Sequence, residues 1–191
     1  MKSLRTLSKQ EIKIINNQLF SQFNLSFPSG LRYYLNDRER LFVVNSDFTK
    51  VDERKLIIDR VGLYVAEVKD KEIRLSKEGA QYLGEMARKT KIELKNTVEL
   101  TDEELKLYFK GEDLDKDLDF AQLKTQPKQG ELKQGNKKIS SLTPPQLSLV
   151  PVSSSRMIIL TYHYQIIGCT KYKEKKIHNY HPKQHRGEVI I

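Results

Sequence analysis

The sequence predicts an α+β protein, with a small N-terminal α/β unit followed by a strand-rich C-terminal unit. Three patterns support this prediction: a capped amphipathic helix opens the chain, two hairpin-like segments follow it, and strand-like segments return near its end. The helix and strand signals restart near Thr90. We therefore expect two domains, of residues 1–90 and 91–191, in a chain long enough for two modest cores.

The first helix is marked by a capping box and a regular apolar face. Ser8 in LSKQEI can cap the helix, and Glu11 lies at the position that bonds back to the cap. Four apolar residues then recur at helical spacing: Ile12, Ile15, Leu19 and Phe23. The helix is expected to stop within FNLSFPSG, which contains a proline and a glycine.

Two hairpins are predicted after this helix. Residues 31–44, LRYYLNDRERLFVV, place two apolar runs around a polar turn, and residues 61–76, VGLYVAEVKDKEIRLS, repeat this pattern with KDKE at the tip. Between them, residues 52–60 (DERKLIIDR) are expected to form a helical turn. Residues 77–87 (KEGAQYLGEMA) are expected to form a short helix or a loop.

The second unit starts with a strand and a second capped helix. Residues 91–100, KIELKNTVEL, predict the strand. Thr101 and Glu104 form another capping box, and Gly111 is placed to end the helix. Strand patterning returns in RMIILTYHYQIIGCTKYKEKKIHNY (residues 156–180), with KEKK as a turn, and the final VII could form a closing strand.

An insertion is predicted between these parts, at about residues 120–156. It is rich in Lys, Gln, Gly, Pro and Ser and has almost no aromatic residues, so it lacks the material for a core of its own. A basic segment of this kind can still fold on to RNA when it binds.

The composition favours an anionic partner inside the cell. The net charge of +9 argues for a polyanion such as RNA, DNA or an anionic membrane surface. Cys169 is the only cysteine, so it cannot form an internal disulfide, which fits a reducing compartment. No apolar run has the length of a signal peptide or a membrane span, so we expect a cytoplasmic protein without a membrane partner.

The charge is concentrated in segments of opposite sign. Nine acids lie between Glu99 and Asp119, against three lysines. Residues 121–156 then contain six bases and one acid, and residues 171–191 contain six bases and two acids. A basic region confined to one part of the chain is typical of nucleic-acid binding.

Metal chemistry was considered for three histidines near the C-terminus. His178, His181 and His185 are spaced as if on one face of a helix, but Pro182 disfavours helical backbone at His181. We expect these histidines to lie on a basic loop and expect no metal site.

Catalysis has no supporting motif elsewhere. Cys169 has no partner pattern and is expected to be a small buried residue. The acidic run is expected to be a solvated face, and the sequence has no glycine-rich phosphate loop. We therefore expect neither an enzyme nor a bound cofactor.

Tyrosines and lysines are interleaved near the C-terminus. Exposed rings can stack on bases while lysines contact phosphates. Tyr162 and Tyr164 would share one face of a strand, and either form such a surface or belong to the core of a small barrel. For Tyr180 and the lysines around it the surface interpretation is favoured.

Two stretches resemble the PUA domain, an RNA-binding module named after pseudouridine synthases and archaeosine transglycosylases. TVELTDEELKLYFKGEDL (residues 97–114) resembles its opening strand and helix. YQIIGCTKYKEKKIHNYHPKQHR (residues 164–186) resembles its later strands in RNA 5-methylcytosine methyltransferases of the Nol/Nop/Sun type and in stand-alone archaeal relatives. There the pattern is a strand, G-x-G-K, a turn and I-x-N-x-x-P-K-x-x-R.

The match is specific at seven positions: Gly168, Lys171, Ile177, Asn179, Pro182, Lys183 and Arg186. Thr170 stands where the pattern has its second glycine, and the insertion departs from the compact family form. Residues 32–84 are similar to the domain that precedes PUA in the stand-alone relatives. The methyltransferase part is missing, because there is no cofactor loop and no Pro-Cys nucleophile motif.

The resemblance implies a pre-PUA domain over residues 1–90 and a PUA-like β-barrel over residues 91–191. It implies a protein that binds structured RNA without catalysis. With the basic composition, it points to rRNA in ribosome assembly or on the ribosome, so that the partner is a ribosomal subunit or its precursor; tRNA is the alternative.

Ten residues are expected to contact the RNA. Phosphate contacts are expected from Lys171, Lys173, Lys175, Lys176, Lys183 and Arg186. Contacts to sugars or bases are expected from His178, Asn179, Tyr180 and His181. Two other roles stay open: an adaptor that docks an RNA-modification enzyme through Asp102–Asp119, and a nonspecific RNA chaperone.

Overall fold

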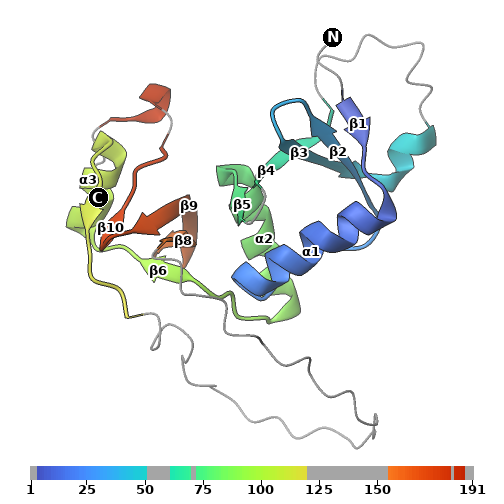
Figure 1. The fold of residues 1–191 in the computed structure, drawn as a ribbon. Coiled ribbons are helices and arrows are strands. Elements are labelled where there is room, and N and C mark those ends of the chain that lie inside the picture. Colours follow the sequence, from blue (N-terminus) through green and yellow to red (C-terminus); the bar gives the residue numbers. More distant parts are fainter. Residues whose placement is uncertain (1–3, 51–60, 70–71, 120–154, 182, 188–191) are drawn as a thin grey trace, which may run out of the picture.

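The structure is a mixed α+β arrangement of two five-stranded sheets, one of them curled like half a barrel. It is a computed structural model, and it describes residues 4–50, 61–69, 72–119, 155–181 and 183–187. In Figure 1, α2 (Lys77–Thr90) and β5 (Glu72–Leu75) lie between the N-terminal strands and the C-terminal strands.

None of the helices in the described part is long and apolar enough to cross a membrane.

The first sheet is an antiparallel meander of five strands in sequence order. Its strands are β1 (Leu4–Thr6), β2 (Leu31–Asn36), β3 (Arg40–Asn45), β4 (Leu63–Lys69) and β5. The pairs β2–β3 and β4–β5 confirm the two predicted hairpins. A short 3₁₀ helix, Ser46–Lys50, follows β3.

The first helix, α1 (Lys9–Phe23), starts and ends as the sequence predicts. The backbone N–H of Glu11 donates to the Ser8 hydroxyl, and the Ser8 N–H donates to the Glu11 carboxylate at 2.9 Å. Ile15, Leu19 and Phe23 face the core. Asn24 takes the left-handed conformation that closes the helix.

The second helix, α2, resolves the choice between helix and loop at residues 77–87. Ser76 caps it by accepting a hydrogen bond from the N–H of Gly79 at 2.9 Å. Gly79 also allows the helix to approach β4 closely, because a Cβ at this position would lie 1.9 Å from the Val65 carbonyl oxygen. The Ser76 hydroxyl donates to the Tyr64 carbonyl at 2.7 Å, which fixes the start of α2 against the sheet.

The second sheet has the strand order β6-β8-β9-β10-β7. Its strands are β6 (Thr97–Glu99), β7 (Leu114–Asp115), β8 (Ser155–Tyr162), β9 (Gln165–Lys173) and β10 (Lys176–Ile177). β6 and β8 are parallel, and the remaining pairs are antiparallel.

The predicted strand at residues 91–100 is wrong for its first half. The N–H of Ile92 donates to the Ala87 carbonyl at 3.0 Å, which closes α2, and the N–H of Lys95 donates to the Phe23 carbonyl at 3.0 Å. These backbone groups are used to join α1 and α2, so only Thr97–Glu99 is available to a sheet.

The third helix, α3 (Asp102–Lys110), confirms the second capping box. The N–H of Glu104 donates to the Thr101 hydroxyl, and the N–H of Thr101 donates to the Glu104 carboxylate. Gly111 ends the helix with a φ of 100°, a value that suits glycine. Leu105 and Tyr108 turn toward the core.

Strand β8 is buried on both faces and separates two hydrophobic clusters. Met157 and Ile159, together with Cys169 of β9, complete the cluster formed by α1, α2 and the first sheet. Ile158 and Leu160 point the other way, into the cluster formed with α3. The core around α2 therefore includes residues from both sides of the predicted domain boundary near residue 90.

Three expectations lie outside the described residues. They are the helical turn at residues 52–60, the insertion except for its last two positions, and the closing strand VII. Ser155 and Arg156, placed at the end of the insertion by composition, are the first residues of β8.

The surroundings of two glycines of α2 predict different responses to alanine substitution. Gly79→Ala should lower the free energy of unfolding by roughly 1–3 kcal/mol, because a backbone carbonyl cannot move aside. Gly84→Ala should change it by less than about 1 kcal/mol, since the added Cβ meets only the mobile end of Ile166 and alanine favours the helix. Urea denaturation measures both; a Gly79→Ala protein as stable as wild type would contradict this packing.

The thiol of Cys169 should be inert in the folded protein. The residue is buried, and this burial raises the pKa of the thiol to about 12. At pH 8 the thiolate fraction is then on the order of 10⁻⁴, and the reagent is also excluded. Titration with a chromogenic disulfide should detect no fast thiol in native buffer and one thiol in urea; rapid native reaction would show that this part of the core opens.

Candidate nucleic-acid interface

The basic C-terminal segment starts in two inner strands of the second sheet and continues into a loop. It follows the end of β9, a turn at Glu174 and Lys175, strand β10, and a loop that leads to a short 3₁₀ helix at Lys183–His185. Both turn residues have positive φ, of 52° and 61°, which matches the tight turn predicted for KEKK.

The acidic segment lies directly against this basic segment. β7 pairs with β10, so that Asp115 is the register partner of Lys176, and their charged groups are 3.5 Å apart. Lys175 lies 2.5 Å from Asp117, and this carboxylate raises the pKa of Lys175. Strand pairing thus places the acids of one segment opposite the bases of the other.

The remaining cations of the strands are also paired. Lys171 contacts Glu72 of β5 at 3.3 Å, and Lys173 contacts Glu174 at 2.9 Å, which lowers the pKa of Glu174. His178 Nδ1 lies 3.1 Å from Asp113. Four lysines thus face five carboxylates (Glu72, Asp113, Asp115, Asp117 and Glu174). The strand part of the basic segment, residues 171–178, is therefore close to neutral together with its partners.

Asn179 attaches the loop to the end of α3. Its side-chain amide donates to the Tyr108 carbonyl at 2.6 Å and the Glu112 carbonyl at 3.0 Å. Its backbone N–H donates to Asp113 at 2.6 Å, and its side-chain oxygen accepts from the N–H of His181 at 2.9 Å. These bonds join the loop to the C-terminal end of α3 and to the residues that follow it, so Asn179 has a structural role.

His181 and Arg186 also face inward. His181 is buried, with its ring 4.7 Å from Phe109 in an edge-to-face contact. The Arg186 guanidinium donates to the His181 carbonyl at 3.2 Å and covers Gly111, where a Cβ would meet it at 2.6 Å. Thr170, fully buried, donates its hydroxyl to the His178 carbonyl and so replaces the expected glycine with a direct tie to the loop.

Besides the paired lysines Lys173, Lys175 and Lys176, two of the predicted contact residues are exposed, Tyr180 and Lys183. Tyr180 is 41% exposed, and Lys183 is exposed with no ion pair to any residue in the described part of the chain. The Arg74 guanidinium of β5 lies 5.1 Å above the Tyr180 ring. Arg74 was not predicted; its alternation with Ile73 and Leu75 is the only signal that places it on an outer face.

The other tyrosines divide between core and surface. Tyr172 is buried and its hydroxyl accepts the N–H of Leu118. Tyr162 packs on the α3 cluster and bonds to Asp102 at 3.1 Å. Tyr164 is 95% exposed in the β8–β9 turn, so the expectation that it shares a strand face with Tyr162 is wrong; the strand ends before it.

Within the described residues, no group of three His, Cys, Asp or Glu side chains is arranged to hold a metal ion. His178 contacts Asp113, whereas His181 packs against aromatic rings of α3. The two side chains therefore have different partners.

The acidic segment is largely engaged by its own chain. Glu104 contacts Lys116 at 2.7 Å, Asp102 accepts the Tyr162 hydroxyl, and the acids of β7 and its flanks face the basic segment. Fewer carboxylates of Asp102–Asp119 are therefore available to an outside partner than the sequence suggests.

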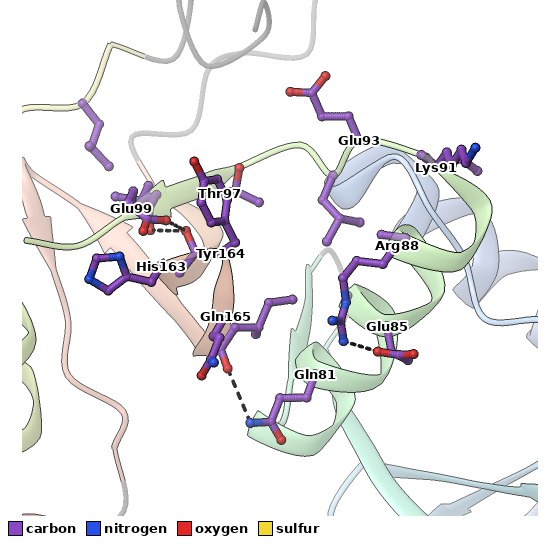
Figure 2. A pocket seen from close by; sticks show the side chains of 18 of the residues that line it. Gln81, Glu85, Arg88, Lys91, Glu93, Thr97, Glu99, His163, Tyr164 and Gln165 are labelled. Carbon is purple, nitrogen blue, oxygen red and sulfur yellow. Dashed lines mark hydrogen bonds and ion pairs between the residues drawn. The ribbon is translucent and has the colours of Figure 1, made fainter. Parts of the chain in front are cut away.

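A wide cleft of about 1330 Å³ separates α2 from the β8–β9 turn (Figure 2). Glu85 and Arg88 of α2 bond to each other on one side, and His163 and Tyr164 lie on the other. Three bases (Arg88, Lys91 and Lys116) and three acids (Glu85, Glu93 and Glu99) line it. This balance gives the cleft no preference for an anion over a cation.

The structural role of Asn179 can be separated from RNA contact by measuring stability without RNA. Asn179→Ala should lower the free energy of unfolding by about 1–3 kcal/mol, because it removes the side-chain hydrogen bonds to the Tyr108 and Glu112 carbonyls and the acceptor of the His181 N–H. Lys183→Gln, four residues away and exposed, should change it by less than about 0.5 kcal/mol. Equal stabilities of the two variants would show that the loop is not held through Asn179.

Comparison with known proteins adds no relative: no protein-family model matches this chain, and no curated protein matches its sequence.

Proposed function

We propose that this chain is a non-catalytic RNA-binding protein whose C-terminal unit is a PUA-like module. The single observation that carries the proposal is the anchored loop formed by residues 178–181 and 183–186. It is held to α3 by Asn179, His181 and Arg186, and it presents Tyr180 and Lys183 to solvent. A rigid loop with an exposed ring and cation loses little conformational entropy when it binds an RNA.

The fold of the second unit supports the module assignment. A strand leads into a capped helix, and the sheet then continues through β8, β9 and β10, with Ile177 and Asn179 at the positions that the resemblance requires. Both residues are accounted for by packing and by hydrogen bonds to α3. The motif therefore describes how the loop is attached, and the exposed residues around it are the ones proposed to contact RNA.

The charge distribution sharpens the proposed site. A phosphate contact is proposed at Lys183; Arg74, which lies beside Tyr180, already contacts Glu67 at 2.7 Å. Lys173, Lys175 and Lys176 contribute less, because a phosphate that approaches them also meets their own carboxylates. The basic insertion, with a net charge of +4 from five lysines and one glutamate over residues 121–154, supplies further positive charge.

Structured rRNA, in a ribosomal subunit or its precursor, is the proposed ligand, with tRNA the alternative. Shape recognition by a fixed loop suits folded RNA, whose backbone geometry differs from site to site. The adaptor hypothesis has weaker support, because the acids of Asp102–Asp119 mostly contact their own chain.

Two variants that each replace one lysine by glutamine, and so remove the same charge, test the proposal. In filter-binding titrations of an RNA hairpin at several salt concentrations, Lys183→Gln should weaken binding several-fold. It should also reduce the slope of log K against log salt by about 0.7–0.9, because one phosphate contact is lost. Lys175→Gln removes the same charge from a lysine already paired with Asp117 and should leave the slope nearly unchanged.

Two results would count against the proposal. Equal effects of the two substitutions would show that total charge, and not the anchored loop, determines binding. Binding that does not respond to salt would exclude phosphate contacts altogether.

A further inference from the structure

The first sheet has a face that the hydrophobic core does not use. Leu41, Val65 and Ile73 point toward α1 and α2 and belong to the core cluster. Phe42 and Tyr64 occupy the alternate positions on β3 and β4, so they lie on the opposite face. Among the described residues, neither ring is a member of either hydrophobic cluster, and both are half-buried.

These rings form a row across the strands. Phe42 is the register partner of Tyr34 on one side and of Tyr64 on the other. The ring centroids of Phe42 and Tyr64 are 5.5 Å apart, with an angle of 43° between their planes. An aromatic pair that is close and half-exposed offers an apolar surface to a ligand.

Arginines flank the rings along the row. The Arg40 guanidinium lies 5.4 Å above the Tyr64 ring, and the Arg74 guanidinium lies 5.1 Å above the Tyr180 ring. Arg74 and Arg40 both lower the pKa of Tyr64, although burial raises it more. We call Arg40, Phe42, Tyr64, Arg74 and Tyr180 the aromatic–arginine strip.

The strip carries an excess of positive charge. Glu67 contacts Arg74 at 2.7 Å and Lys69 at 3.7 Å, and Glu72 contacts Lys171 at 3.3 Å. With Arg40, four cations thus accompany two carboxylates along the strip. The neutral strand part of the C-terminal segment differs in this respect, so the first sheet is the more favourable surface for phosphate.

This chemistry matches an unpaired nucleic-acid strand. Bases of a single strand can stack on exposed rings and on guanidinium planes while its phosphates meet the cations. The bases of a double helix are stacked on each other and cannot reach such rings. The strip also ends at Tyr180, three residues before Lys183, so one RNA could follow it from the first sheet to the loop.

We propose that the aromatic–arginine strip binds an unpaired RNA segment next to the structured part that the loop holds. This inference rests on the proposed RNA-binding function and adds the class of ligand: a structured RNA with a single-stranded extension. We infer an RNA single strand as the ligand from the positive charge of the strip and from its continuity with Tyr180.

Two fluorescein-labelled RNAs test the strip: a blunt hairpin, and the same hairpin with a single-stranded tail of about 12 nucleotides, within the range that such surfaces cover. Wild type should bind the tailed hairpin more tightly in fluorescence anisotropy. Tyr64→Leu and Tyr180→Leu should each weaken tailed-hairpin binding by about 5-fold or more, because one stacking contact is lost. Binding of the blunt hairpin should stay within about 2-fold at Tyr64→Leu, since this ring lies off the loop.

Matched variants separate stacking from other effects. Tyr64→Phe and Tyr180→Phe keep the ring and should bind the tailed hairpin as wild type does. Tyr164→Leu makes the same change at a fully exposed tyrosine of the β8–β9 turn and should have no effect. Tyr180 belongs to both the loop and the strip, so its leucine variant is judged by the ratio of its affinities for the tailed and the blunt hairpin. Thermal melts show whether Tyr64→Leu lowers stability.

The outcomes distinguish the two proposals. Tailed and blunt hairpins bound equally by wild type, or leucine variants that bind the tailed hairpin normally, would overturn the strip and leave the RNA-binding proposal standing. A wild-type protein that binds neither hairpin would overturn both. Loss of tail-dependent binding in both leucine variants and its retention in both phenylalanine variants would establish the strip.

Discussion

The two-sided burial of β8 is the constraint on which the remaining structure depends. Successive residues of this strand complete different clusters, Met157 and Ile159 on one side and Ile158 and Leu160 on the other. A polar residue at any of these positions would face apolar side chains without a hydrogen-bond partner. The strand therefore fixes where α2 and α3 lie, and through them where the first sheet and the loop meet.

Local charge balance changes the meaning of the composition. The chain has a net charge of +9, but its most basic stretch lies against its most acidic one, and the pairing of β7 with β10 brings them together. Because exposed ion pairs contribute little to stability, this arrangement mainly orients the turn and cancels its field. Lys183 and Arg40, which form no ion pair with another residue of the described ranges, then matter more to a polyanion than the lysine-rich turn does.

Sequence patterns predicted the elements whose causes are local. The capping boxes at Ser8 and Thr101 join residues three positions apart, and the hairpins follow from apolar runs around polar turns. Local patterns could not show that residues 91–96 are not a strand. Their backbone hydrogen bonds go to α1 and α2, and α1 lies far away in the sequence. The candidate site was predicted by composition, yet the partners that decide each side chain's role, such as Asp113 for His178 and Arg74 for Tyr180, lie far along the chain.

The position of β8 in the chain also sets an order of events during synthesis. The cluster around α1 and α2 needs Met157, Ile159 and Cys169, which emerge only after most of the chain has been made. The N-terminal unit leaves the ribosome first, so its apolar face stays exposed until these residues have been made. The contacts that close it join residues far apart in sequence, so they form late and make folding slow for a protein of this size.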